Sequence, residues 1–433
     1  MNHATSTNCI FPVINFTQVK EKVLNWADRF NTFCFLDNHQ YKSRLHTVEC
    51  VLAAGAANFL MADTGNALEK LQEFISADRR WLFGHLGYDL KNEIENVHSS
   101  NLDKVQFPDL YFFQPEILIK FDGKQMFIKS SNRDAGEIYD EILRAGDPSP
   151  VIPGPINIQS RIGKQEYISI IQKLKRNILR GDCYEINFCQ EFFAEDVIID
   201  PVDVYKKLSA VSPNPFSGFY KLANKYLLCA SPERFLKKKG NKLISQPIKG
   251  TSKRDRDKVE DDEFKEELRQ SAKDRSENVM VVDLIRNDLS KICLEGTVKV
   301  DELYGVYSFP QVHQMISTIS GELKPDISFK EIIKATFPMG SMTGAPKKRV
   351  LELIEQYEKT KRGIFSGAIG YITPEGDFDF NVVIRSIMYN ANNSYLSFQT
   401  GSGITFYSEA DKEWEECLLK AEAIREVLVR NQV

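Results

Sequence analysis

The sequence predicts an α+β fold (layered α/β) in which large, mostly antiparallel sheets are flanked by helices. Short alternating or apolar segments typical of β-strands recur along the chain, and amphipathic helical patterns lie between and after them. Clusters of strands followed by helices favour antiparallel sheets over regular parallel strand–helix units. The 433 residues are 42% hydrophobic and 27% charged, which is the composition of an ordinary globular protein.

Charge and cysteine usage exclude several functional classes. A net charge of -4 provides no overall basic surface for nucleic acid. The eight cysteines contain no C-x-x-C pair, so we expect reduced thiols. No secretory leader is recognisable at the first residues, and the most apolar stretch, Val51–Ala62, is too short to cross a bilayer. We therefore expect a cytoplasmic protein with neither nucleic-acid nor membrane partners.

A segment rich in proline and glycine, residues 146–163, predicts a junction between two regions. The first region, 1–150, is expected to contain a strand at 31–37 and a strand that runs into a helix at 81–95. The second region, 164–430, is expected to carry the function.

The second region opens with a helix at 164–182, which Gly181 ends, and a strand at 183–195. The highly charged segment 254–278 predicts a solvated helix with internal ion pairs. Further strands are expected at 225–231, 242–248, 296–308, 313–323, 366–373, 378–390 and 394–406.

Acidic residues on two predicted helices are candidate metal ligands. Glu277 lies at the edge of an apolar helical stripe, and on spacing alone a surface acid is the more common explanation. In the helix 408–430, Glu413, Glu416 and Lys420 follow one another at i, i+3 and i+7 beside an apolar seam. Carboxylates from two helices are the ligands that Mg²⁺ accepts. The alternative for the second helix is an ordinary Glu416–Lys420 surface salt bridge.

Glycine-rich turns and one buried cation are candidate anion sites. Gly401 and Gly403 are expected in a strand-to-helix turn, and a second glycine-rich segment, Gly340–Gly344, precedes another helix. Neither segment fits the P-loop or dinucleotide motif, and a plain tight turn is the alternative for each. Arg385 lies in an otherwise apolar strand pattern, so it requires an acidic partner from a ligand or from the protein.

Two further basic residues allow more than one interpretation. Lys249 stands between a short apolar segment and the turn 250–252, where it is either a solvated loop cation or a nucleophile directed into a pocket. His313 lies in an apolar strand pattern, where a core histidine with satisfied hydrogen bonds is the more common explanation.

Eight segments, taken in order, resemble the motifs of the chorismate-utilising enzymes. This family comprises anthranilate synthase component I, aminodeoxychorismate synthase component I, and the isochorismate and salicylate synthases. The segments are SPERFL, PIKGTSKR, AKDRSENVMVVDLIRNDLSKI, FPMGSMTGAPKKRVLELI, SGAIGYIT, IRSIMY, GSGI and EWEECLLKAEAI. The resemblance runs from about Lys164 to Val429, and the first half resembles the family more loosely at GHLGYDLK and FPDLYFF. It implies the anthranilate synthase component I-like fold.

The resemblance also implies a metal site and a substrate site. Mg²⁺ would bridge the ring carboxylate of chorismate to Glu277 and Glu416, with Glu413 acting through water. Contacts with the two carboxylates of the substrate are implied for Arg385, Lys420 and the backbone amides of Gly401 and Gly403, and Thr251 is a further substrate-binding residue. Two opposed anion sites suit a dicarboxylate.

Three residues are implied to take part in catalysis. Glu233 would protonate the departing 4-hydroxyl, which requires a raised pKa. His313 would lie near the ring, in a role left open. Most branches carry alanine at the position of Lys249, whereas PIKG is typical of the branch that aminates chorismate at C4. There the lysine attacks C2 and ammonia then adds at C4, so we expect the pKa of Lys249 to be lowered by desolvation or nearby positive charge.

The position of Glu185 separates the branches further. Isochorismate and salicylate synthases place a water-activating lysine there, and this chain does not, so the role of Glu185 stays open. Related synthases bind tryptophan near the segment 33–40, but the match in this chain is poor and no ligand is assigned.

The predicted activity is the conversion of chorismate and ammonia to 4-amino-4-deoxychorismate, toward p-aminobenzoate and folate. The chain shows no G-x-C-x-G nucleophile motif, so a separate glutamine amidotransferase is expected to supply ammonia within a heterodimer. The alternatives are the reaction of anthranilate synthase component I and, from another class, a non-catalytic protein that binds chorismate or the amidotransferase.

Overall fold

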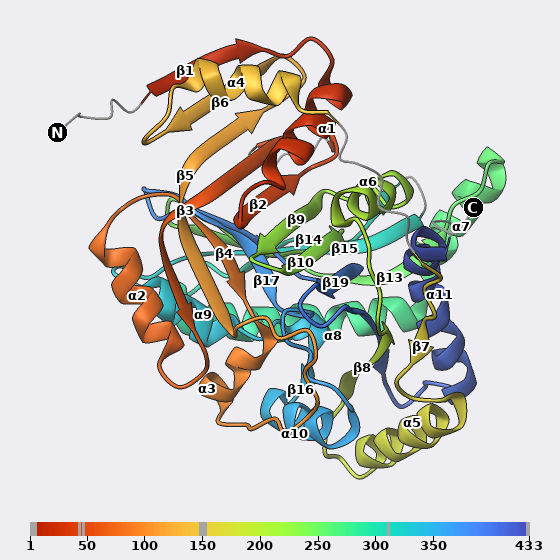
Figure 1. The fold of residues 1–433 in the computed structure, drawn as a ribbon. Coiled ribbons are helices and arrows are strands. Elements are labelled where there is room, and N and C mark those ends of the chain that lie inside the picture. Colours follow the sequence, from red (N-terminus) through yellow and green to blue (C-terminus); the bar gives the residue numbers. More distant parts are fainter. Residues whose placement is uncertain (1–6, 42–44, 46–47, 147–153, 310–311, 430–433) are drawn as a thin grey trace.

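The computed structural model describes residues 7–41, 45, 48–146, 154–309 and 312–429, and Figure 1 shows their arrangement. The described strands pair antiparallel and helices flank them, which confirms the predicted α+β fold. Among the described residues, no helix is both long enough and apolar enough to cross a membrane.

One run of paired strands leads from the first region to the candidate site. In pairing order it contains β1 (Thr7–Pro12), β6 (Gln125–Ser130), β5 (Leu110–Phe121), β3 (Cys50–Ala62), β2 (Thr32–Asp37), β9 (Phe216–Leu222), β10 (Lys225–Ser231), β19 (Ser386–Asn390), β20 (Tyr395–Ile404) and β8 (Glu185–Ala194). Two short strands, β7 (Gln159–Ser160) and β16 (Gly344–Ala345), pair with the two ends of β8.

A second run branches from β5 and ends at the strand that carries Lys249. Its strands are β4 (Leu82–Leu86), β17 (Ala368–Ile372), β18 (Phe378–Asn381), β11 (Arg234–Lys239), β12 (Lys242–Gln246) and β15 (Val312–Glu322), and β15 also pairs with β13 (Ile248–Lys253) and β14 (Lys299–Ser308). The two runs bring residues from distant parts of the chain to one place.

The helices cover these strands. They are α1 (Phe16–Ala27), α2 (Ala67–Ala77), α3 (Lys91–Glu95), α4 (Ala135–Arg144), α5 (Lys164–Leu179), α6 (Pro201–Val211), α7 (Lys258–Gln270), α8 (Ala272–Ile292), α9 (Phe329–Thr336), α10 (Lys347–Tyr357) and α11 (Ala410–Val429), with 3-10 turns at Tyr88–Leu90 and Gly340–Met342. Helix α8 lies against β13 and β15, and α11 lies against β20 (Figure 1). These two helices carry the predicted metal ligands.

Two apolar cores lie between the layers. In the first, α5, α6 and α11 pack on β8 and β20, and Tyr167 contacts Phe188 and Trp414. In the second, α8 and α9 pack with β4 and β17 through residues such as Leu289 and Ile333. All ten residues of β8 are buried, including the polar side chains of Glu185, Asn187 and Glu191.

The two predicted regions share their sheets. Strand β2 of the first region pairs with β9, and β4 pairs with β17. The predicted junction at 146–163 lies partly outside the described residues.

Three segment predictions need correction. The charged segment 254–278 is not one helix, because Ser271 ends α7 and its side chain caps α8 through the amide of Asp274. The predicted strand 378–390 is interrupted, with Arg385 between β18 and β19 at a positive φ of 51°. Gly401 and Gly403 lie within β20, paired with Cys189 and Asn187, rather than in a turn.

Candidate active site

Lys249 lies in a bulge of β13, at the edge of the second run of strands. Ile248 pairs with Ile316 and Thr251 with Gln314, so β13 has one extra residue between these two pairs. Gly250 makes the bulge possible, since its φ is +92° and a Cβ there would lie 2.9 Å from Oδ1 of Asp274 on α8. The bulge brings the strand close to α8 and leaves the side chain of Lys249 buried, so Lys249 is not a solvated loop cation.

The partner of Lys249 is Glu185, the first residue of β8. The Nζ atom of Lys249 donates a hydrogen bond to Oε1 of Glu185 over 2.6 Å. Gly403 on the neighbouring strand leaves room for the pair, because a Cβ there would lie 2.8 Å from Oε1 of Glu185 and 3.0 Å from Nζ of Lys249. A buried ion pair therefore fills the centre of the site.

The pKa of Lys249 does not follow the prediction. Burial by itself lowers this pKa, but the carboxylates of Glu185, Glu277 and Glu233 outweigh burial and hold the pKa above its ordinary value. The expectation of a lowered pKa is wrong for the resting protein, because Lys249 is surrounded by acids rather than by other cations. In this state Lys249 is a charged ammonium.

Glu233 lies between β10 and β11, and it has the raised pKa that a general acid requires. Burial raises the pKa of Glu233 to about 7, against the opposing influence of Ser341, Lys249 and Arg385. Two backbone hydrogen bonds hold it near Arg385: the amide of Val382 donates to the carbonyl of Glu233, and the amide of Ala230 donates to the carbonyl of Arg385. A small cavity beside Glu233 is lined by Pro247, Ile285, Gly340 and Ser341, among others.

Arg385 is a half-buried cation whose acidic neighbour is Glu233. Burial lowers the pKa of Arg385 to about 10, and Glu233 opposes this shift. Glu233 acts on the guanidinium through its charge, and a planar guanidinium suits a carboxylate ligand.

Three glutamates from α8 and α11 lie around one lysine. The Nζ atom of Lys273 lies 3.9 Å from Oε1 of Glu277 and 3.8 Å from Oε1 of Glu413. Glu277 Oε1 and Glu413 Oε2 are buried atoms without a hydrogen-bond partner among the described residues. Burial raises the pKa of Glu277 to about 7, with Lys249 opposing and Glu185 reinforcing the shift. Unpartnered carboxylate oxygens from two helices suit a hard divalent cation.

Glu416 and Lys420 form the salt bridge that the sequence offered as the alternative, over 2.7 Å. Burial favours a higher pKa for Glu416, but Lys420 and Lys273 bring the pKa below its ordinary value. Lys420 also donates a hydrogen bond to the carbonyl oxygen of Gly401 over 2.8 Å. Glu416 therefore already has a cationic partner, and Lys273, which lies within 4 Å of Glu277 and Glu413, also lowers the pKa of Glu416.

Two predicted site residues stand apart from this centre. Both ring nitrogens of His313 are engaged, Nδ1 with the hydroxyl of Ser308 at 2.9 Å and Nε2 with Asp261 at 3.0 Å. His313 is fully buried, which is the arrangement of a core histidine with satisfied hydrogen bonds, and no contact brings it to Lys249. Thr251 is exposed on β13 beyond the bulge.

Sequence reasoning missed one member of the site and left another open. Lys273 precedes Glu277 by four residues, and this i, i+4 spacing could have identified it as the counter-ion of the acidic cluster. The role of Glu185 was left open, since its contact with Lys249 joins residues 64 positions apart and no local pattern records it.

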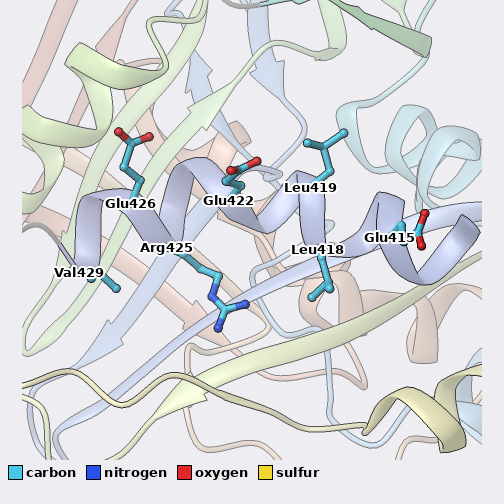
Figure 2. Close-up of a pocket in the computed structure, with 7 residues that line it drawn as sticks. All are labelled: Glu415, Leu418, Leu419, Glu422, Arg425, Glu426 and Val429. Carbon is cyan, nitrogen blue, oxygen red and sulfur yellow. The ribbon is translucent and has the colours of Figure 1, made fainter. Parts of the chain in front are cut away.

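Three other hollows lie away from these residues. One follows α11, where Glu415, Leu419, Glu422 and Arg425 are among the lining side chains (Figure 2). Another lies between α5 and the end of α10. The third lies beside β2 and is lined by Asp37, Ser217, Arg234 and Asp379, among others. Its charges are already paired, Asp37 with Lys20 at 2.9 Å and Arg234 with Asp379 at 2.9 Å.

Residues 25–426 match the sequence profile of the chorismate binding enzyme family. The match covers most of the chain and every strand of both runs except β1, so this protein belongs to the chorismate binding enzymes.

Individual relatives carry two different names. The chain is 33% identical over 365 residues to an anthranilate synthase component I-like protein of Synechocystis, covering 83% of this chain and 74% of that protein. It is 32% identical over 361 residues to aminodeoxychorismate synthase component 1 of Bacillus subtilis, covering 80% and 76%. The crystal structure of anthranilate synthase component I from Streptococcus pneumoniae matches with a TM-score of 0.76 and 26% identity, covering 89% of this chain and 94% of that one.

Proposed function

We propose that this chain is an aminodeoxychorismate synthase component I, which converts chorismate and ammonia to 4-amino-4-deoxychorismate. The observation that carries the proposal is the buried Lys249, in a site lined by Glu185, Glu233 and Glu277. Lys91, Lys221 and Lys237 are also buried, each in an ion pair outside the site. Lys249 differs from them because three carboxylates from separate elements surround its ammonium group. The name of the Bacillus subtilis relative supports the same reaction.

In the proposed reaction the Lys249 amine attacks C2 of chorismate while the 4-hydroxyl leaves. Glu233 donates the proton that converts this hydroxyl to water, and its pKa of about 7 allows it to hold that proton near neutral pH. Ammonia then adds at C4 and releases Lys249. Because amination occurs at C4 and pyruvate is retained, the product is not aromatic.

We propose that Mg²⁺ is bound by Glu277 and Glu416 directly and by Glu413 through water. The unpartnered oxygens of Glu277 and Glu413 support this set of ligands. The bound cation would offset the negative charge of the ring carboxylate. Lys420, next to Glu416, would orient the same carboxylate, and Arg385 with the amides of Gly401 and Gly403 would hold the enolpyruvyl carboxylate.

We propose that ammonia comes from a separate glutamine amidotransferase. The names of component I relatives support a second component, and free ammonium can replace it in an assay. The product then feeds the synthesis of p-aminobenzoate and folate.

A direct assay tests the proposal. The full chain is incubated with chorismate, MgCl₂ and ammonium chloride, and the products are separated by chromatography. We expect 4-amino-4-deoxychorismate from the parent and none from Lys249→Ala. Anthranilate as the product would assign the reaction of anthranilate synthase instead, which the name of the Synechocystis relative favours. Chorismate binding without turnover would identify a non-catalytic binding protein.

A further inference from the structure

We propose that Glu185 accepts the proton of Lys249, so that the lysine becomes a neutral nucleophile only when the proton passes to its partner. The inference rests on the proposed function, because only a nucleophilic Lys249 requires a proton acceptor. It assigns the residue whose role the sequence left open.

The geometry of the pair suits proton transfer. Oε1 of Glu185 lies 2.6 Å from Nζ of Lys249, which is slightly shorter than is typical of a charge-assisted hydrogen bond between an ammonium and a carboxylate. The second oxygen, Oε2, is buried and has no partner among the described residues, so Lys249 is the one group that holds this carboxylate. Because the two groups are hydrogen-bonded directly, the proton can pass between them without a water molecule or a third side chain.

The backbone fixes the acceptor in place. Glu185 pairs with Ala345, and a Cβ on Gly344 would lie 2.0 Å from the carbonyl oxygen of Glu185, so the two strands are in close contact. The lysine is on the opposite side, in the bulge of β13. The donor and the acceptor therefore belong to two rigid elements rather than to loops.

The other acids that face Lys249 have different tasks. Glu233 faces it from the connection between β10 and β11, near Arg385, and must keep its own proton for the departing hydroxyl. Glu277 faces it from α8, near Lys273, and is a proposed metal ligand. Among these three carboxylates, Glu185 is the one left to receive the lysine proton.

The proton and electron balance closes over one turnover. An N–H bond of Lys249 breaks, an O–H bond forms on Glu185, and the free amine forms a bond to C2. The ring double bonds shift, the C4–O bond breaks, and the proton of Glu233 leaves in water. When ammonia bonds to C4, the electron pair of the C2–N bond returns to Lys249. Glu185 then returns its proton to the lysine, and Glu233 takes one from the new ammonium group.

Single-turnover experiments test this assignment. The full chain is mixed with chorismate and saturating MgCl₂ without ammonia, quenched at successive times, and analysed for the Lys249 adduct by mass spectrometry between pH 6 and pH 9. At pH 7 we expect the adduct to form about 100-fold more slowly in Glu185→Gln than in the parent. The ratio of the two rates should fall as pH rises, because hydroxide replaces the missing acceptor. Glu233 is present in both proteins, so its titration affects both rates and is removed when the ratio is taken.

Control variants separate proton transfer from structural damage. Glu195→Gln removes an exposed glutamate beyond the end of β8, and it should behave as the parent. If Glu185→Gln does not fold, Glu185→Asp provides the test. This variant retains a carboxylate acceptor, so its rate of adduct formation should depend on pH in the same way as that of the parent.

Two failures can be told apart. No adduct in the parent would overturn the proposed function together with this inference. Adduct formation at the same rate and with the same pH profile in the parent and Glu185→Gln would overturn the role of Glu185 alone. In Glu185→Asp, the rate of adduct formation could instead rise with pH as steeply as in Glu185→Gln. That result would also overturn the role of Glu185.

Discussion

Gly403 faces Lys249 so closely that a Cβ on the glycine would lie 3.0 Å from the lysine Nζ. Gly403→Ala should therefore push Lys249 and Glu185 out of position. We expect kcat to fall about 100-fold, and overpacking should lower the free energy of unfolding by about 1–3 kcal/mol. Steady-state kinetics and thermal melting measure the two effects.

Gly123→Ala is the matched control, because nothing lies within 4 Å of the added Cβ and the backbone is not left-handed. Normal turnover in Gly403→Ala would show that the space beside the ion pair is not needed.

Glu233→Gln should lower activity and raise stability at alkaline pH. Without the carboxylic acid, adduct formation should fall by about 100-fold or more. The pKa of Glu233 is raised to about 7 from 4.5, so between these values the folded protein holds a proton that the unfolded chain has released. The stability of the parent therefore falls as pH rises through this window.

Glu233→Gln lacks this loss of stability. Its free energy of unfolding should therefore rise relative to that of the parent by up to about 3 kcal/mol between pH 4 and pH 8. Denaturant unfolding at several pH values measures the difference. A difference that is constant with pH would show that Glu233 ionises normally in the folded protein.

Magnesium should stabilise the parent and not Glu277→Gln. Binding to the folded state alone raises the melting temperature, by about 3 °C at 100 times the dissociation constant. Because burial raises the pKa of Glu277 to about 7, metal binding must displace a proton, and the shift should increase from pH 6 to pH 8.

Sodium chloride at equal ionic strength controls for screening. Equal shifts of the melting temperature in the parent and in Glu277→Gln would show that Glu277 is not a ligand of the metal.

Arg385→Ala should weaken the binding of chorismate. Loss of a guanidinium–carboxylate interaction should raise KM by about 10- to 100-fold. Arg385→Lys keeps the charge but not the planar donor pair, so it should restore only part of the affinity. An unchanged KM in both variants would show that Arg385 interacts with Glu233 and does not bind the substrate.

The sequence predicted Glu233 and Glu277, two of the acids that the structure places around Lys249, because ordered motifs record residue types that chemistry requires. It could not show how they meet. Arg385 was predicted within a strand, because its neighbours are apolar, but tertiary contacts interrupt that strand and turn the arginine toward Glu233.

The glycines of β20 illustrate a second limit. The segment that contains Gly401 and Gly403 has the composition of a turn. In the structure, however, these positions require glycine because neighbouring atoms pack closely against them. A Cβ on Gly401 would lie 2.4 Å from the sulfur of Cys189. Packing across strands depends on register, which one-dimensional patterns do not contain.

The pKa of Lys249 shows a third limit. Residue type and burial predict a lowered pKa, whereas the acids around the ammonium raise it. The sign of such a shift depends on which charges surround the group, and these charges come from β8, α8 and the connection before β11.

The pairing of β2 with β9 and of β4 with β17 has a consequence for genetic dissection of the protein. A fragment that begins after residue 163 would leave one edge of β9 and one edge of β17 without the strands that cover them. Strand edges without a hydrogen-bonded neighbour promote aggregation. The catalytic half should therefore be insoluble when produced by itself, and co-production of residues 1–146 as a separate polypeptide should rescue it by fragment complementation.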